Sequence, residues 1–244
     1  MFKKILIYSA AAIAAGYIAF ALLFLTKEEE GALCKGLKIS ITDGGAGALT
    51  NEKVASLLSV KGIDPVNKAI ESINCQEIEN VIGKLSVVEE CQAYKTHRGY
   101  IGIDIDCKIP IMQAFDINGR EFYIDDKGTI IEGIHNAMYL PVANGFITPE
   151  MADKELLTIA RFLQENRFWN EQIEQIFFTA KKEVLLVPRI GNHTIELGGV
   201  NNLEKKLDKL RKFYKKGLNT IGWNKYKKIN IEFDKQVICT KRDK

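Results

Sequence analysis

The chain opens with one unbroken apolar run and then turns to short segments in which apolar and polar residues alternate. The run covers residues 5–25, ILIYSAAAIAAGYIAFALLFL, and contains no charged residue. At about 1.5 Å of rise per residue, a helix of this length spans about 30 Å, which is the thickness of a bilayer's hydrocarbon core. The pattern therefore predicts a transmembrane helix over residues 5–26.

Lysines on the short N-terminal side of this run predict how the helix is oriented. Lys3 and Lys4 place residues 1–4 in the cytoplasm as a short tail, and the chain that follows a linker at residues 27–36 lies outside the cytoplasm. The alternative is a cleaved signal peptide, because the AFA at residues 19–21 resembles an A-x-A cleavage site. A signal's apolar region usually runs about 7–15 residues, so the length of this run favours a membrane anchor.

Residues 37–110 predict a compact α+β unit with the element order β-α-α-β-β. The segment LKISIT at 37–42 alternates apolar and polar residues, as a half-buried strand does. Asn74 and Glu77 fit a capping box that precedes an apolar stripe at helical spacing. The predicted elements are a strand at 37–42, helices at 50–58 and 74–85, and a hairpin of strands at 87–95 and 100–107.

The remainder, residues 111–244, predicts a β-rich domain with two helices and an edge strand at its C-terminal end, so the chain is of the α+β class. Thr148 and Pro149 fit the N-cap and first position of one helix. The second helix, at 202–215, has an apolar stripe and carries lysines on its other faces. Further predicted strands lie at 113–117, 121–124, 173–179, 183–189 and 193–198.

The segment INIEFDKQVICTK, residues 229–241, predicts two final strands, Ile229–Phe233 and Val237–Thr240. The last strand of a sheet has unpaired N–H and C=O groups along its outer edge unless something covers them. We expect Ile229–Phe233 to pair with the domain's own sheet and Val237–Thr240 to form the outer edge.

The charges are unevenly distributed and restrict the possible partners. Residues 201–244 contain 14 Lys and Arg against 5 Asp and Glu, whereas the whole chain has a net charge of +3. A basic module of this kind suits nucleic acid, but the predicted position outside the cytoplasm excludes that partner. Membrane lipid and an acidic protein surface remain as partners. The alternative is that the lysines form only the solvated face of the helix at 202–216.

The sequence lacks the residue patterns that catalysis or cofactor binding requires. It has no G-x-S-x-G and no H-E-x-x-H, and the GGAG at 44–47 lacks the Gly-Lys-Ser/Thr ending of a phosphate-binding loop. His97, His135 and His193 are isolated, which favours surface or packing roles over a zinc site. We therefore expect no enzyme activity, no catalytic residue, no metal and no cofactor.

Five cysteines with no C-x-x-C spacing do not predict a disulfide framework. Cys91 and Cys107 lie on the two strands of the predicted hairpin, so a bridge between them is one alternative. Buried thiols that act as small apolar side chains are the favoured one.

Three segments resemble the FtsQ/DivIB family of bacterial division proteins, most closely the Bacteroidetes type. IPIMQAFDINGREFYIDDKG at 109–128 resembles the junction between the family's two domains, and LPVANGFIT at 140–148 resembles the stretch before the second domain's helix. FYKKGLNTIGWNKYKKINIEFDKQVICTK at 213–241 resembles the family's C-terminal end. The family's plan is also similar: a short tail, one transmembrane helix, a POTRA domain of the order β-α-α-β-β and a strand-rich second domain.

The resemblance implies a non-enzymatic scaffold of the divisome, held in the inner membrane at the division septum with its bulk in the periplasm. It implies that the POTRA domain recruits upstream division proteins such as FtsK. It also implies that the last strand binds FtsB/FtsL-like proteins by β-augmentation, in which a partner strand pairs with an exposed sheet edge. Carried onto this sequence, the partner-binding residues are Phe233 and Lys235 at the approach and Gln236, Val237, Ile238, Cys239, Thr240 and Lys241 along the edge.

Two other function classes remain open on the sequence alone. One is a membrane-anchored POTRA-type assembly or secretion protein, which usually carries repeated POTRA units or a following barrel. The other is a cell-wall enzyme or a regulator of such an enzyme. Catalysis by the enzyme needs clustered carboxylates or a nucleophile in a cleft.

Overall fold

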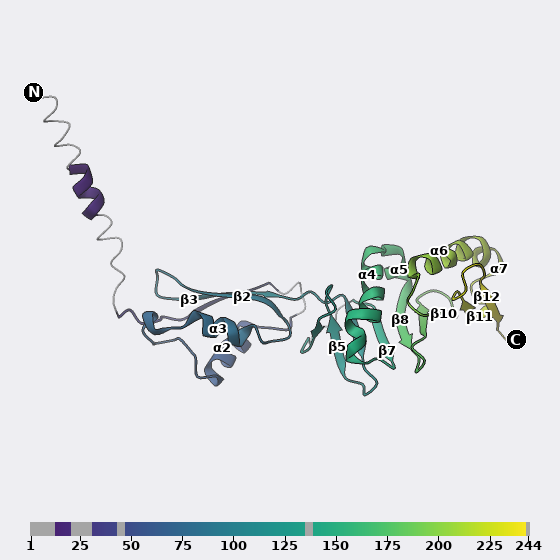
Figure 1. The fold of residues 1–244 in the computed structure, drawn as a ribbon, viewed down its shortest axis with the longest axis horizontal. Coiled ribbons are helices and arrows are strands. Elements are labelled where there is room, and N and C mark those ends of the chain that lie inside the picture. The colour runs from purple at the N-terminus through teal and green to yellow at the C-terminus, as the bar shows by residue number, and fades with distance from the viewer. Residues whose placement is uncertain (1–12, 21–30, 43–46, 135–138, 243–244) are drawn as a thin grey trace, which may run out of the picture. The chain divides into compact units, whose positions relative to one another are not determined.

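The computed structural model describes residues 13–20, 31–42, 47–134 and 139–242 (Figure 1). Judged by the contacts within the chain, the protein divides into two compact units. One unit comprises the residues up to Ser40 together with Asn51–Gly83 and Cys91–Ile105, and the other comprises Ile41–Thr50, Lys84–Glu90 and the chain from Asp106 onward.

The predicted transmembrane helix is described only in its middle part. Residues 13–20 are helical, whereas residues 5–12 and 21–26 lie outside the described residues. Within the part of the chain that the structure describes, no helix is both long and apolar enough to cross a membrane. The anchor therefore stays a prediction from the sequence.

A three-stranded sheet and two helices form the predicted β-α-α-β-β unit. The strand order is β1-β3-β2, so β3 is central. The Asn74 side chain accepts a hydrogen bond from the Glu77 N–H at 3.3 Å, so it caps α3 as the capping box predicts. The elements are β1 (Leu37–Thr42), α2 (Asn51–Val60), a 3-10 turn (Ile70–Ser72), α3 (Cys75–Ile82), β2 (Val88–Lys95) and β3 (Ile101–Cys107). Its buried residues include Val54, Leu58, Ile78, Ile82, Ile101, Ile103 and Ile105.

The β-rich domain is built on one nine-stranded sheet with the order β12-β11-β10-β9-β8-β7-β4-β5-β6. Three of the neighbouring pairs are parallel: β4 with β7, β7 with β8, and β10 with β11. Parallel neighbours need a long crossover connection, and helices form two of these crossovers. The strands are β4 (Met112–Phe115), β5 (Glu121–Ile124), β6 (Ile130–Ile131), β7 (Val142–Gly145), β8 (Ile173–Phe178), β9 (Val184–Pro188), β10 (Thr194–Gly198), β11 (Tyr226–Asn230) and β12 (Ile238–Lys241).

One face of this sheet forms the main hydrophobic core. The strand registers align one row of side chains across eight strands, namely Cys239, Ile229, Ile195, Leu186, Ile176, Ala143, Ala114 and Phe122. All of these are buried except Cys239, which is half-buried. Helices α4 (Leu157–Glu165), α5 (Arg167–Gln172) and α6 (Leu203–Phe213) contribute to the same core and lie along one side of the sheet (Figure 1).

Helix α6 connects β10 to β11 and packs an apolar stripe on these strands. The stripe comprises Leu203, Leu207, Leu210 and Tyr214, all buried as their spacing predicts. The helical path is longer than the predicted 202–215, because a π-helical turn (Tyr214–Leu218) and α7 (Asn219–Ile221) continue it. It ends at Gly222, whose φ of +94° suits glycine and no longer fits a helix.

The final strands begin and end at other residues than the sequence predicts. β11 covers Tyr226–Asn230 instead of 229–233, and residues 231–237 form the connection to β12. The pairing with β10 stops at Asn230, opposite Glu196, although β10 continues to Gly198. Beyond it, the Ile231 C=O accepts a hydrogen bond from the Lys209 Nζ of α6. The short elements α5, β6 and β7 were also not predicted.

The five cysteines form no disulfide, so the alternative of a Cys91–Cys107 bridge is wrong. Cys34 and Cys107 are buried and the other three are half-buried. Burial raises the pKa of the Cys91 thiol to about 11. The Cys91 thiol therefore stays protonated near neutral pH, and the buried thiols act as small apolar side chains.

Replacing Leu210 by Ala tests how far the domain depends on the α6 stripe. Leu210 is fully buried, and such a truncation costs about 2–5 kcal/mol because it leaves a cavity. We expect a lower urea midpoint, followed by the fluorescence of Trp169 and Trp223, the chain's two tryptophans. Lys212→Ala, on the exposed side of the same helix, is the control and should leave the midpoint nearly unchanged. Equal midpoints for Leu210→Ala and the wild type would contradict this packing.

Candidate functional site at the last strand

Strand β12 forms one end of the nine-stranded sheet, and among the described residues β11 is its only strand neighbour. The Arg242 N–H donates to the Lys225 C=O at 3.1 Å, so it points towards β11. Alternate residues of a strand direct their backbone groups to opposite sides. Cys239 and Lys241 therefore direct their N–H and C=O groups away from β11, to the side on which no described strand pairs with β12.

The structure divides the predicted partner-binding residues between this strand and the connection before it. Ile238, Cys239, Thr240 and Lys241 form β12. Phe233, Lys235, Gln236 and Val237 lie in the connection, and all of these except the half-buried Val237 are exposed. The edge is therefore shorter than the predicted Gln236–Lys241. Its first residue is Ile238 because β11 ends at Asn230, the residue opposite Ile238.

Side chains along β12 alternate between the two faces of the sheet. Cys239 lies opposite the buried Ile229 and packs against the core, and this partial burial raises the pKa of its thiol. Val237 packs against the same core and anchors the start of the strand. Ile238 lies on the other face, opposite Asn230, and is 46% exposed. An added strand would therefore contact one apolar side chain on the open face of the sheet.

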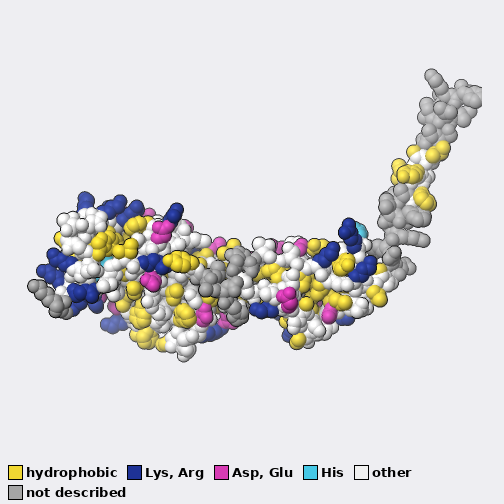
Figure 2. All heavy atoms as spheres, turned by 180° about the vertical axis from the view of Figure 1, so that it is seen from behind, with side chains coloured by type: hydrophobic (Ala, Val, Ile, Leu, Met, Phe, Trp, Pro, Cys, Tyr) yellow, Lys and Arg dark blue, Asp and Glu magenta, His cyan; other side chains and the backbone are white. Residues whose placement is uncertain are grey.

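An ion pair ties β10 to β11 on the open face. The Lys228 Nζ lies 2.7 Å from the Glu196 Oε1, and the Asn230 Nδ2 donates to the Glu196 Oε2 at 3.2 Å. The hydrogen bond from Lys228 outweighs the opposing effect of burial and holds the pKa of Glu196 below its usual range. Lys235 and Lys241, before and at the end of β12, are also exposed. Figure 2 shows Lys and Arg side chains gathered at this end of the chain, at the left of the view.

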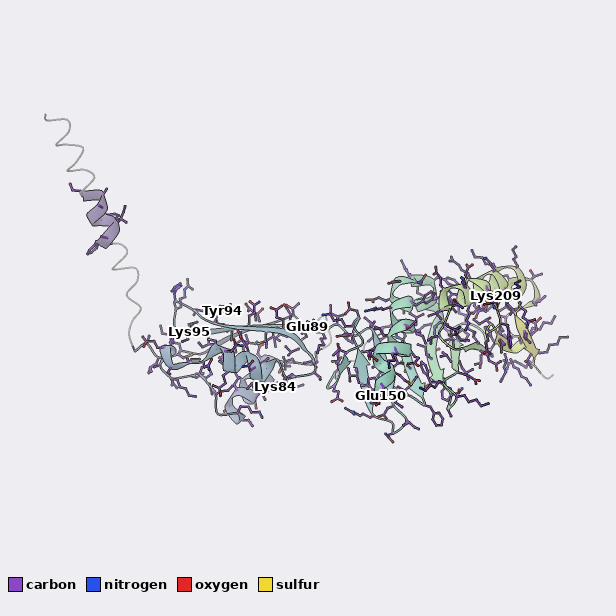
Figure 3. All side chains as sticks on the ribbon, viewed as in Figure 1. Lys84, Glu89, Tyr94, Lys95, Glu150 and Lys209 are labelled. Atoms are coloured by element: carbon purple, nitrogen blue, oxygen red, sulfur yellow. The ribbon has the colours of Figure 1, made fainter. Side chains whose placement is uncertain are left out.

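Two lysines of α6 point towards the strands. Lys206 is 4% exposed, and its Nζ donates to backbone carbonyls at the end of β10 at 2.8 and 3.1 Å. The Lys209 Nζ donates to the Ile231 C=O at 2.9 Å and to the Phe233 C=O (Figure 3). The alternative that the lysines of this helix form only a solvated face is therefore wrong for these two residues.

A buried histidine packs just before β10. His193 is 3% exposed, and its Nε2 lies 2.9 Å from the Tyr214 Oη. Its ring also packs near Trp223, while its Nδ1 has no hydrogen-bond partner among the described residues. Burial, and to a lesser extent the charge of Arg242, lowers the pKa of the imidazole. Of the two roles left open by the sequence, His193 has the packing role, whereas His97 is exposed.

The described histidines do not gather with other side chains into a metal site. Within the described ranges, no group of three or more His, Cys, Asp and Glu side chains is placed to hold a metal ion. His135 and residues 44–46 of the GGAG segment lie outside the described residues. The arrangement described above offers backbone hydrogen-bonding groups, one apolar side chain and lysines, which together suit binding of a polypeptide strand.

Two family models match the chain, one to each part. The model described as a POTRA-like domain matches residues 32–106. The model described as FtsQ/DivIB, C-terminal related, matches residues 109–240, which is more than half of the chain and reaches into β12. A search of curated proteins finds no match.

We expect the protein to lose stability as the pH falls below about 6.5, the pKa of histidine in an unfolded chain. Because the pKa of His193 is lowered in the folded protein, the unfolded state binds more protons below that pH. The contribution of neutral His193 is fully present above about pH 6.5 and is lost as the pH falls towards the folded pKa. Urea unfolding at about pH 7.5 and about pH 5.5 measures this loss.

Two substitutions distinguish the effect of His193 on stability from the effects of other titrating groups. His193→Gln keeps hydrogen-bonding atoms but does not titrate, so its urea midpoint should fall less between the two pH values than that of the wild type. His97→Gln, at an exposed position, is the matched control and should fall as the wild type does. A fall of equal size in all three proteins would show that His193 is not responsible.

Proposed function

Because the chain belongs to the FtsQ/DivIB family, we propose that it is a single-pass membrane scaffold of the bacterial divisome. In this proposal the N-terminus is cytoplasmic, residues 5–26 cross the inner membrane, and the bulk of the chain lies in the periplasm at the division septum. The uncharged run and the lysines before it support this topology. The protein acts by linking division proteins and catalyses no reaction.

The open edge of β12 is the observation that carries the proposal. The backbone groups of Cys239 and Lys241 point away from β11, within or next to the region that matches the family model. A strand from an FtsB/FtsL-like partner pairs with these groups by β-augmentation. The main chain supplies the hydrogen bonds, and alternate side chains supply the specificity.

Charge at this edge indicates the kind of strand that fits. Lys241 is exposed at the end of the edge, Lys235 is exposed in the connection before it, and Lys225 and Lys227 are exposed on the neighbouring segment. Lysines along an edge disfavour pairing between two copies of the same strand, because the like charges repel. A partner strand with Asp or Glu residues turns the same charges into attractive contacts.

The other partners in the proposal bind elsewhere on the chain. The POTRA-like region, residues 32–106, supports recruitment of upstream division proteins such as FtsK. Exposed lysines of the helix at 202–216 are suited to anionic membrane lipid.

Replacing Lys241 by Pro tests strand addition at β12. The Lys241 N–H points away from β11, so proline removes a donor that the fold itself does not use. Loss of one such bond, with the added bulk of the ring at the edge, should weaken binding to a co-expressed FtsB/FtsL-like pair by about tenfold or more. Pull-down of the pair with the full chain in detergent measures the effect.

Lys241→Ala is the matched control for this substitution. It removes the charge but keeps the backbone donor, so it should bind the pair more tightly than Lys241→Pro. Circular dichroism and urea midpoints check that both variants are folded. Binding by a folded Lys241→Pro variant that equals binding by the wild type would contradict the proposed edge.

A further inference from the structure

Helix α6 contacts the two strands that it connects through lysine side chains as well as through its apolar stripe. Lys206 and Lys209 are three residues apart, so they lie on neighbouring turns of one side of the helix. Both donate to backbone carbonyls at the carboxyl ends of the strands, Lys206 at β10 and Lys209 just after β11. These ends adjoin because β10 and β11 are parallel. We call Lys206 and Lys209 the lysine clamp.

Lys206 binds the end of β10. Its Nζ donates to the Leu197 C=O at 3.1 Å and the Gly199 C=O at 2.8 Å, and it lies 3.4 Å from the Asn201 Oδ1. A buried ammonium group is costly unless polar atoms satisfy it, and these three oxygens do so. Burial nevertheless lowers the pKa of Lys206, against the opposing charge of Glu232.

Lys209 binds the start of the connection between β11 and β12. Its Nζ donates to the Ile231 C=O at 2.9 Å and to the Phe233 C=O. On the strand side, the Ile231 N–H donates to the Glu196 C=O at 2.9 Å. The first residues of the connection are therefore fixed from two sides. Strand β10 accepts a hydrogen bond from the Ile231 N–H, and Lys209 of α6 donates to the carbonyls of Ile231 and Phe233.

Only residues 234–237 separate this fixed part from β12. A chain spans at most about 3.3–3.6 Å per residue, so the position of Phe233 restricts where β12 begins. Val237 packs against the core at the far end of the same short segment. The connection is thus held at both ends, by Lys209 at one and by apolar contact at the other.

We infer that the lysine clamp positions the open edge of β12. The importance of that edge rests on the proposed function, whereas the positioning itself is a property of the protein without a partner. By fixing the carbonyls of Ile231 and Phe233, the clamp makes β12 pair with β11 in one register and presents Cys239 and Lys241 as one extended edge. A preordered strand loses less conformational entropy when a partner pairs with it. Lys206 and Lys209 are therefore positioning residues that raise affinity without contacting the partner.

Two other lysines of α6 can be compared with the lysine clamp. Lys205 and Lys212 are exposed, and Lys212 pairs with Asp208 one turn earlier at 2.7 Å. These side chains add charge to the basic end of the molecule without contacting the connection. Lys212 therefore matches Lys209 in residue type and helix but differs in the contact to be tested.

The experiment compares Lys209→Met, Lys209→Arg and Lys212→Met in the full chain in detergent micelles. Hydrogen–deuterium exchange reports the order of β12 through the amides of Ile238 and Thr240. These two amides point towards β11, because backbone groups alternate in direction along a strand. We expect these amides to exchange at least about tenfold faster in Lys209→Met. Amides of β8 should keep the wild-type rate, because the change is local. Lys209→Arg, which keeps a charged donor, should restore most of the protection, and Lys212→Met should exchange as the wild type does.

The outcomes distinguish the inference from the proposed function. Unchanged exchange at β12 in Lys209→Met overturns the inference, whatever the partner does. Faster exchange at β12 and β8 together also overturns it, because that result shows a general loss of stability. Faster exchange confined to β12 supports the inference, and weaker binding of the FtsB/FtsL-like pair by the same variant then supports the link to affinity. If the wild-type chain does not bind the pair at β12 at all, the proposed function fails while the local exchange result still supports the clamp.

Discussion

The C-terminal end of the fold depends on the packing of α6 across the parallel strands β10 and β11. Parallel neighbours cannot be joined by a tight turn, so the chain has to leave the sheet after β10 and return beside it. Helix α6 makes this return with a buried stripe that includes Leu207 and Leu210. The π-helical turn and α7 extend the path to Gly222, and β11 then enters the sheet next to β10. The position of β12 follows from that of β11, because the two form an antiparallel pair.

Polar contacts add to the apolar stripe in holding α6 and the last strands in place. The stripe fixes how α6 lies on the sheet, but apolar contacts have little directional preference. Lys206 and Lys209 add directional bonds to carbonyls at the strand ends, and the Lys228–Glu196 pair ties β11 to β10 on the open face. The sheet therefore ends in an ordered strand whose outer side is open. This combination of an ordered position and an open edge suits a protein that links partners, and it connects the crossover to the proposed function.

Periodicity predicted the parts of the fold that local sequence determines. The alternation at 37–42, the Asn74 cap and the leucine stripe of α6 all appear in the structure as predicted. Strand order could not be predicted, because a period of two residues indicates which face is buried but not which strand lies alongside. For the same reason the predicted end of β11 lies three residues too late, since that end depends on where the pairing with β10 stops.

At the candidate site, the sequence predicted an edge close to β12 but left the role of the α6 lysines open. Ile238–Lys241 lie at the predicted edge, whereas Phe233, Lys235 and Gln236 belong to the connection. Lys206 and Lys209 resemble surface lysines in the sequence, and only the close approach of the β10 and β11 ends shows that their acceptors are backbone carbonyls. His193 was likewise indistinguishable from an exposed turn residue, because its burial arises from Tyr214 and Trp223 far along the chain.

The central claim is that a partner strand pairs with the outer side of β12. Hydrogen exchange at the two outward-facing amides, Cys239 and Lys241, measures this pairing directly when the full chain is compared with and without a bound FtsB/FtsL-like pair. The account predicts that both amides exchange slowly only in the complex, while the amide of Thr240 between them changes much less. Rapid exchange at Cys239 and Lys241 in a saturated complex would contradict it, because the partner would then be bound elsewhere.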